Sequence, residues 1–138
     1  MQNIVVVSMN KNLAILIAEK IAKMLSLTLI NADDDLEARL MKSLDFPLDV
    51  AQYSMDNLEK NLLTDLSDRD NIVICMSDDV FLANENSKIF KKSLKILVKI
   101  DKTEKITNGI QNLLEKYCDV TLHEKNIDFD KLITLLRG

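Results

Sequence analysis

The chain has 138 residues and a formal net charge of −4, and 47% of its residues are hydrophobic while 29% are charged. This composition suits one soluble globular domain, and the excess of acids argues against general binding to nucleic acid or to an anionic membrane. Only two residues are glycine, Gly109 and Gly138, so a glycine-rich phosphate loop or dinucleotide fingerprint cannot be present in standard form.

Strand-like and helical patterns alternate along the whole chain. In chain order they predict a strand over Ile4–Val7, a helix over Leu13–Leu25, a strand over Leu27–Ile30, helices over Asp33–Leu44 and Val50–Leu66 separated by Phe46-Pro47, a strand over Ile72–Met76, a polar helix over Asn84–Lys92, a strand over Lys95–Ile100, a helix over Asn108–Tyr117, a strand over Val120–Leu122 and a helix over Phe129–Leu136.

This alternation predicts one α/β domain over residues 1–138, a three-layer sandwich with a five-stranded parallel sheet. The most apolar strands, Ile4–Val7 and Ile72–Met76, are expected at its centre. No apolar run is long enough to cross a membrane, no basic leader is evident, and Cys75 and Cys118 stand alone. We therefore expect a cytoplasmic protein without disulfides.

Acidic residues gather where the predicted strands end, which is where ligands bind in sheets of this kind. They are Asp33, Asp34 and Asp35 after the second strand, Asp78 and Asp79 after the third, and Asp101 after the fourth, with Lys11 and Lys102 as nearby cations. One hypothesis is a divalent cation held by Asp33, Asp35 and Asp78. The alternative is that these acids cap helices, with Asp34 and Glu37 at capping-box spacing. Asn10 or Asn12 is a candidate cap for the first helix.

The order of strand, loop, buried helix, short strand and acidic turn resembles the start of a shikimate kinase. The similarity runs without a gap from Ile4 through Asn31-Ala32-Asp33 to Leu36-Glu37-Ala38-Arg39. The stretches 71–80 and 114–120 also resemble the family's third strand and the approach to its last strand. The resemblance implies a fold similar to that of the P-loop kinases, and it implies that Asp33 binds substrate hydroxyls.

The residues that carry catalysis in that family are mostly absent. In the ungapped register, the loop glycines of the family correspond to Ser8, Lys11 and Leu13. The Walker lysine corresponds to Ala14, and the magnesium-binding hydroxyl corresponds to Ile15. Asn31 replaces a carboxylate beside Asp33, and the triple glycine becomes Ser77-Asp78-Asp79. The two substrate-binding arginines fall near Asp56 and Ile110, and only nine residues separate Ile100 from Ile110, so the lid is missing.

We therefore expect a non-catalytic relative of shikimate kinase, with no catalytic residue and no required cofactor. Its role would be to bind a small polyol-like metabolite through Asp33, or to bind or regulate another protein. Lys11 is either a displaced phosphate-binding lysine or a solvated loop lysine. One alternative is a diverged kinase of aromatic amino-acid biosynthesis that uses ATP and magnesium. The other is a cation-dependent site on the acidic rim.

Overall fold

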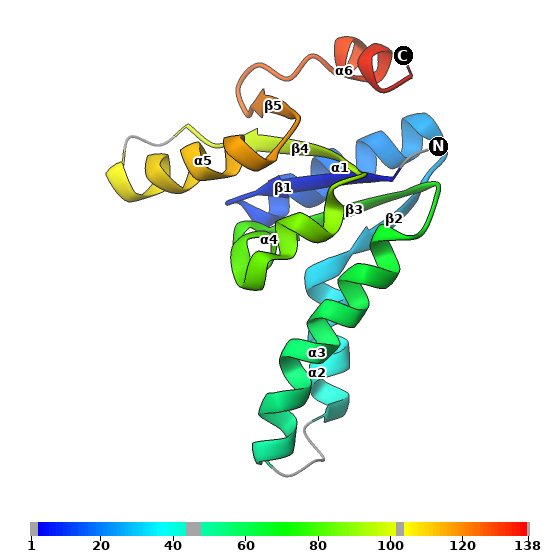
Figure 1. Ribbon diagram of the computed structural model, residues 1–138. Helices are drawn as coiled ribbons and strands as arrows, with labels where there is room; N and C mark the ends of the chain where they lie inside the picture. The colour runs from blue at the N-terminus through cyan, green and yellow to red at the C-terminus, as the bar shows by residue number, and fades with distance from the viewer. Residues whose placement is uncertain (1–2, 44–47, 102–103, 138) are drawn as a thin grey trace.

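The computed structural model describes residues 3–43, 48–101 and 104–137 (Figure 1). In chain order its elements are β1 (Ile4–Ser8), α1 (Lys11–Leu25), β2 (Thr28–Asn31), α2 (Ala32–Ser43), α3 (Leu48–Ser67), β3 (Ile72–Ser77), α4 (Asp78–Leu82), the 3₁₀ segment η1 (Ala83–Phe90), β4 (Leu94–Lys99), α5 (Lys105–Tyr117), β5 (Val120–His123) and α6 (Phe129–Arg137). The expected helix end at Leu44, the break at Phe46-Pro47 and the cation Lys102 lie outside the described residues.

The five strands form one parallel sheet in the order β2-β3-β1-β4-β5. This confirms the predicted α/β fold and the central position of β1, whose residues are all buried, as are those of β3. Because side chains alternate between the two faces of a strand, β1 contributes to two separate cores. Val5 and Val7 belong to one, and Ile4 and Val6 belong to the other.

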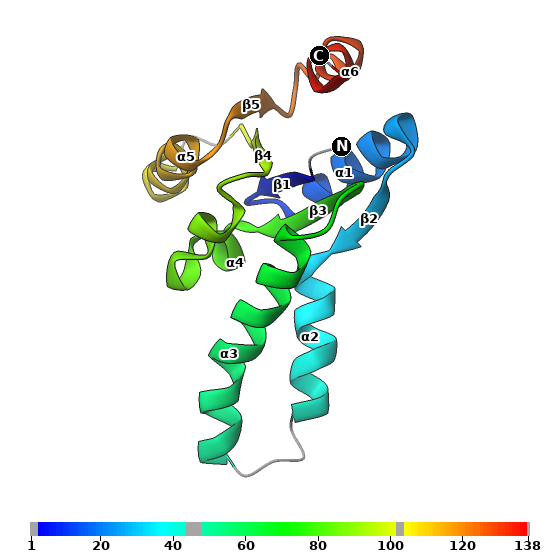
Figure 2. The same cartoon turned by 45° about the vertical axis from the view of Figure 1, so that its right-hand side comes forward.

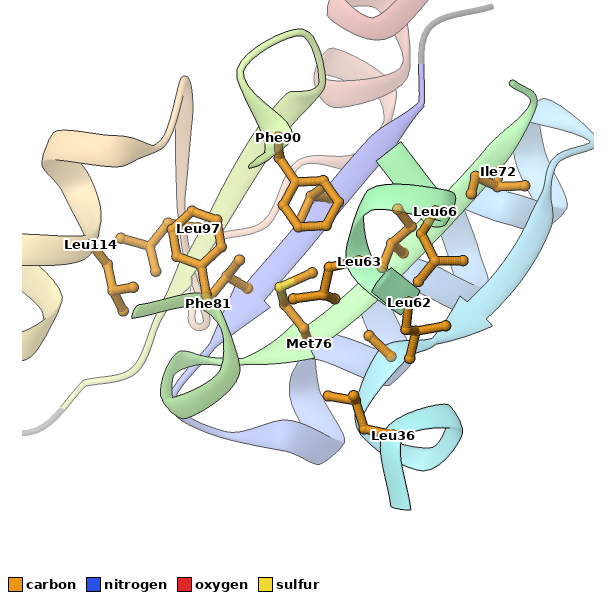
Figure 3. Packing of buried hydrophobic residues seen from close by; sticks show 14 residues of the cluster. Leu36, Leu62, Leu63, Leu66, Ile72, Met76, Phe81, Phe90, Leu97 and Leu114 are labelled. Carbon is orange, nitrogen blue, oxygen red and sulfur yellow. The ribbon is translucent and has the colours of Figure 1, made fainter. Parts of the chain in front are cut away.

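The two cores make the middle of a three-layer structure. On one face, α3, α4, η1 and α5 cover the sheet. The ring of Phe90 lies close to Leu63 and Met76, and the ring of Phe81 lies beside Leu97 (Figure 3). On the other face, α1 and α6 cover it, with Ala14, Ile17 and Leu132 buried there. Figure 2 shows α2 and α3 running side by side away from the sheet as a long arm. No helix in the described part of the chain is long and apolar enough to cross a membrane.

The predicted helix over Asn84–Lys92 is wrong. Most of the segment is instead the 3₁₀ segment η1, which follows the short helix α4 and ends at Phe90. Asn84 and Glu85 have φ values of 48° and 60°, in the left-handed region that is incompatible with a continuous right-handed helix. The polar composition suggested a solvated helix, but Asn86, Ser87 and Phe90 turn inward and are buried.

The amino-terminal end of the sheet is fastened by one buried side chain. The amide nitrogen of Asn3 donates to the carbonyl oxygens of Leu66 at 3.3 Å, Ser67 at 2.8 Å and Arg69 at 2.9 Å. Its oxygen accepts a hydrogen bond from the hydroxyl of Ser93. Asn3 therefore ties β1 both to the end of α3 and to the residue that precedes β4.

Candidate functional site

The connection from β1 to α1 is very short, since only Met9 and Asn10 separate the two elements. The Ser8 hydroxyl donates to the carbonyl of Val98 at 2.9 Å and accepts from the backbone N–H of Asn10 at 3.2 Å. The side chain of Asn10 then accepts from the N–H of Leu13 at 3.2 Å, which confirms Asn10 as the cap of α1. The Ser8 side chain therefore ties the end of β1 to β4, and the Asn10 side chain caps the helix that follows.

The residues that follow Asn10 lie inside α1. Lys11 is its first residue, and Leu13 and Ala14 lie within its first turns. The N–H of Ala14 donates to the carbonyl of Asn10 at 3.1 Å, and the Ala14 side chain is 1% exposed in the core beneath the helix. The N–H of Ala14 thus bonds to Asn10 at the start of the helix, as N–H groups do after the first turn of a helix.

Carboxylates lie beside the start of α1. A hollow of about 350 Å³ is lined there by Asn10, Lys11, Asp101 and Glu124, among others. The N–H of Asp101 donates to the Glu124 carboxylate at 2.7 Å, and the Lys125 ammonium lies 3.6 Å from the carboxylate of Asp101. Among the described residues that line this hollow, Lys11 is the single cation, and Asp101 already has Lys125 as its ion-pair partner.

Asp33 joins two strand ends. One carboxylate oxygen accepts from the N–H of Ser77 at 2.8 Å, and the other accepts from the Ser77 hydroxyl at 2.7 Å. The ammonium of Lys11 lies 3.8 Å from the same carboxylate. The structure thus brings together Lys11 and Asp33, which the sequence singled out separately, and it adds Ser77, which the sequence marked only as a replacement for glycine.

The helix caps differ from those that the acidic pattern predicted. Asn31, not Asp34, caps α2, because its side-chain oxygen accepts from the N–H of Asp34 at 3.2 Å. Ser77, not Asp78 or Asp79, caps α4, accepting from the N–H of Val80 at 3.3 Å. The acids occupy the first turns of these helices, where they interact favourably with the helix dipole.

A pocket of about 470 Å³, which we call the Asp33 pocket, opens between α1, α2 and α3 over the carboxyl ends of β2 and β3. Its charged lining residues are Lys11, Asp33, Asp34, Glu37 and Glu59. Neither Asp35 nor Asp78 lines it. Within the described residues, no group of three or more His, Cys, Asp or Glu side chains is placed to hold a metal ion, so the set Asp33, Asp35 and Asp78 does not form such a site.

Glu59 reaches the Asp33 pocket from α3, and sequence reasoning missed it. The side-chain amide of Asn86, which is 1% exposed, donates to the Glu59 carboxylate and to the carbonyl of Val80 at 2.8 Å. The Asn86 oxygen has no hydrogen-bond partner among the described residues. No pattern in the sequence links residues 27 positions apart, and the contact arises only because η1 folds back against α3.

Asp78 provides a test of the electrostatics at this edge of the sheet. Burial, followed by the charges of Asp79 and Asp33, raises the pKa of the Asp78 carboxyl above its ordinary value of 3.8. The folded state therefore binds the Asp78 proton more tightly than the unfolded chain does. The resulting stabilisation is present below pH 3.8 and is lost as the pH rises through the raised folded pKa.

We accordingly expect Asp78→Asn to raise the midpoint of thermal unfolding at neutral pH, and the gain should shrink toward zero in acid. Melting curves of both proteins between neutral pH and about pH 3 measure this difference. The exposed Asp35→Asn is the control and should show no gain at neutral pH. An Asp78→Asn protein that is less stable than the wild type at neutral pH would contradict the interpretation.

Both cysteines are free thiols held in unreactive surroundings. Burial, with a further contribution from the charge of Asp33, raises the pKa of Cys75 to about 11. Burial also raises the pKa of Cys118 to about 12, with Lys95 opposing and Asp119 adding to the shift.

Because the thiolate is the reactive form, we expect iodoacetamide near neutral pH to leave Cys75 and Cys118 unmodified in the folded protein and to label both cysteines in denaturant. Mass spectrometry reads the outcome, and prompt labelling of the folded protein would refute it.

Comparison with known proteins identifies the scaffold. The family model described as Shikimate kinase matches residues 16–112. A crystal structure of shikimate kinase from Bacteroides thetaiotaomicron superimposes with a TM-score of 0.70 at 12% sequence identity, covering 99% of this chain and 98% of the other. A search of the curated proteins finds no match. The family match spans well over half of the chain, and the chain therefore belongs to the shikimate kinase family.

Proposed function

We propose that this protein is a non-catalytic member of the shikimate kinase family that binds a small polar metabolite in the Asp33 pocket. Family membership is compatible either with a kinase or with a relative that has lost catalysis. Our preference for the second rests on one observation, which is that α1 begins only two residues after β1. Residues at the positions of the phosphate loop therefore lie within or beside a capped helical turn.

Phosphoryl transfer depends on backbone amides, a cationic side chain and magnesium to position the phosphates and stabilise their charge. Here Ala14 and Ile15 stand where the resemblance places the lysine and the magnesium-binding hydroxyl. Removing a single preorganised donor typically slows an enzyme by about 10²–10³-fold, and several such groups are missing together. The residues present thus do not fit the ATP and magnesium that the family normally uses.

The extent of the family match supports the same interpretation. The matched segment begins at Leu16, just after the residues that would form the phosphate loop, and it continues through β2, β3 and β4 into α5. The segment includes four of the five charged residues of the Asp33 pocket, and Lys11 lies outside it. The part of the chain that the family model matches therefore includes most of the residues that line the Asp33 pocket.

The proposal is tested by titrating the purified protein with ATP and magnesium in a calorimeter. We expect no binding heat at millimolar ATP, since Lys11 is the one candidate cation in the described part of the site and lies beside Asp33. An active shikimate kinase under identical conditions is the control. Saturable, magnesium-dependent binding of ATP would overturn the proposal and favour a diverged kinase.

A further inference from the structure

We propose that α5 is the interface of a homodimer, in which this helix packs in antiparallel orientation against α5 of a second copy of the chain. The inference goes beyond the proposed function, because α5 contributes no described residue to the lining of the Asp33 pocket. It is carried by an exposed apolar row along α5, by hydrogen bonds that fix the rotation of the helix, and by a glycine that the packing of the chain does not require.

Four apolar residues, spaced four, three and four positions apart, form one row along α5, which we call the α5 stripe. They are Ile106, Ile110, Leu113 and Tyr117. Residues at this spacing lie on one side of a helix. Ile106 is 79% exposed, Tyr117 43% and Leu113 41%, while Ile110 is partly buried. A single exposed apolar side chain is common on a protein surface, but a row of them marks an interaction site.

The α5 stripe is separate from the face by which the helix packs on the sheet. That face contains Thr107, Gln111 and Leu114, which are buried. The side chain of Gln111 accepts from the N–H of Ile100 at 2.7 Å and donates to the carbonyl of the same residue at 3.1 Å. These bonds fix the rotation of α5 about its axis, so the stripe is a second apolar face outside the core. Figures 1 and 2 show α5 at the periphery of the molecule, apart from the arm of α2 and α3.

Gly109 lies inside α5 at the border of the stripe, three residues after Ile106 and four before Leu113. A Cβ added at Gly109 would meet no atom within 4 Å, and the φ of this residue is not positive. Glycine inside a helix costs about 1 kcal/mol relative to alanine, and neither space nor backbone conformation within the chain accounts for it. A missing side chain does allow the backbone of another helix to approach closely.

The spacing of the stripe selects a second copy of the chain as the partner. The sequence of four, three and four positions reads the same in both directions. An antiparallel copy therefore sets each Ile106 against Tyr117 of the other chain and each Ile110 against Leu113, so that all four positions pair apolar with apolar. Side chains at this spacing interdigitate when two helices pack along their length, as in coiled coils.

The charges beside the stripe are compatible with this pairing. Lys116 of each copy falls close to Gly109 of the other, and the two Lys116 residues lie about 13 Å apart along the helix axis, so like charges do not meet. The stripe is short, and one helix buries less than the roughly 800 Å² per partner of a standard stable interface. We therefore expect a weak dimer, with a dissociation constant on the order of 100 μM.

Sedimentation of the purified protein between about 5 and 500 μM tests the inference, and the average mass should rise from that of a monomer toward that of a dimer. Leu113→Glu should weaken the association at least about tenfold. Leu16→Glu is the matched control, because Leu16 is 56% exposed on α1, and it should leave the association unchanged. A chain that stays monomeric throughout, or a dimer that Leu113→Glu affects no more than Leu16→Glu, would overturn the inference.

Gly109→Gln separates dimerisation from folding. It should raise the midpoint of thermal unfolding of the dilute protein, because glutamine favours a helix and its Cβ meets no other atom. It should also weaken the dimer several-fold, because a side chain then stands between the two helices. This variant serves as the test if Leu113→Glu does not fold. A Gly109→Gln protein that dimerises as tightly as the wild type would contradict the proposed packing.

The antiparallel orientation is tested by disulfide formation in air between single-cysteine substitutions of the stripe. A mixture of Ile106→Cys and Tyr117→Cys should form the mixed disulfide dimer at least about tenfold faster than either variant forms a dimer with itself. Faster self-coupling of Ile106→Cys than mixed coupling would indicate parallel helices and would overturn the proposed pairing.

Discussion

Replacing Asn3 by alanine is expected to lower the free energy of unfolding by about 3 kcal/mol. The side chain is 5% exposed, and its amide donates to three carbonyl oxygens between Leu66 and Arg69. Alanine leaves these carbonyls and the Ser93 hydroxyl without their partner in a place that water reaches poorly. Each buried group left unsatisfied costs about 1–3 kcal/mol, and partial relaxation at the end of α3 reduces the total.

Urea denaturation of the wild type and the variant measures this loss. Asn61→Ala is the matched control, because Asn61 is exposed on α3 and its loss should change stability by less than about 0.5 kcal/mol. Asn3→Asp provides a second test, since it keeps an acceptor for Ser93 but turns a carboxylate toward carbonyl oxygens. Asn3→Asp should lower the free energy of unfolding at least as much as Asn3→Ala does. An effect of Asn3→Ala no larger than that of Asn61→Ala would show that the Asn3 hydrogen bonds do not stabilise the fold.

Asp33→Asn is expected to cost about 2 kcal/mol of stability, because both oxygens of Asp33 accept hydrogen bonds from Ser77. An asparagine can offer an oxygen to only one of the two donors, and it turns an N–H₂ group toward the other. Ser77 is 1% exposed and also caps α4, so the loss should loosen the contact between α2 and the end of β3. The nearby Lys11 also loses its ion-pair partner.

Asp35→Asn is the matched control for this substitution. Asp35 occupies the same turn of α2 but is exposed, so its loss should cost less than about 0.5 kcal/mol. Denaturation midpoints compare the two variants directly. Ser77→Ala should reproduce part of the Asp33→Asn effect, since it removes one of the two bonds. Equal stability of Asp33→Asn and Asp35→Asn would show that the hydrogen bonds between Asp33 and Ser77 contribute nothing to the stability of the fold.

The fold could be predicted from sequence because its signals are local. Apolar runs such as Ile4–Val7 and Ile72–Met76 are too short for helices, and a sheet covered on both faces gives buried strands this composition. The helices are long and amphipathic, so their existence follows from residue spacing. The failure at Asn84–Lys92 has the same origin, because two residues with positive φ leave no signature in hydrophobic spacing.

The site was only partly predictable because its contacts join distant segments. Lys11 and Asp33 could be named as strand-end residues, but nothing in the sequence shows that Ser77 bonds Asp33 across 44 positions. Glu59 and Glu37 lie on helices that looked like scaffold, and only the packing of α2 beside α3 brings them to one pocket. The lack of glycine predicted that a standard glycine-rich phosphate loop is absent, and the short connection from β1 to α1 could not be foreseen from composition.

The most direct test of the central claim is transfer of the γ-phosphate of ATP to shikimate by the purified protein with magnesium present. Our proposal that this protein is non-catalytic rests on the short connection between β1 and α1, which consists of Met9 and the helix cap Asn10. We therefore predict no phosphorylated product above a no-enzyme blank, under conditions where an active shikimate kinase converts the substrate completely. Catalytic turnover by this protein, abolished on removal of magnesium, would contradict the account.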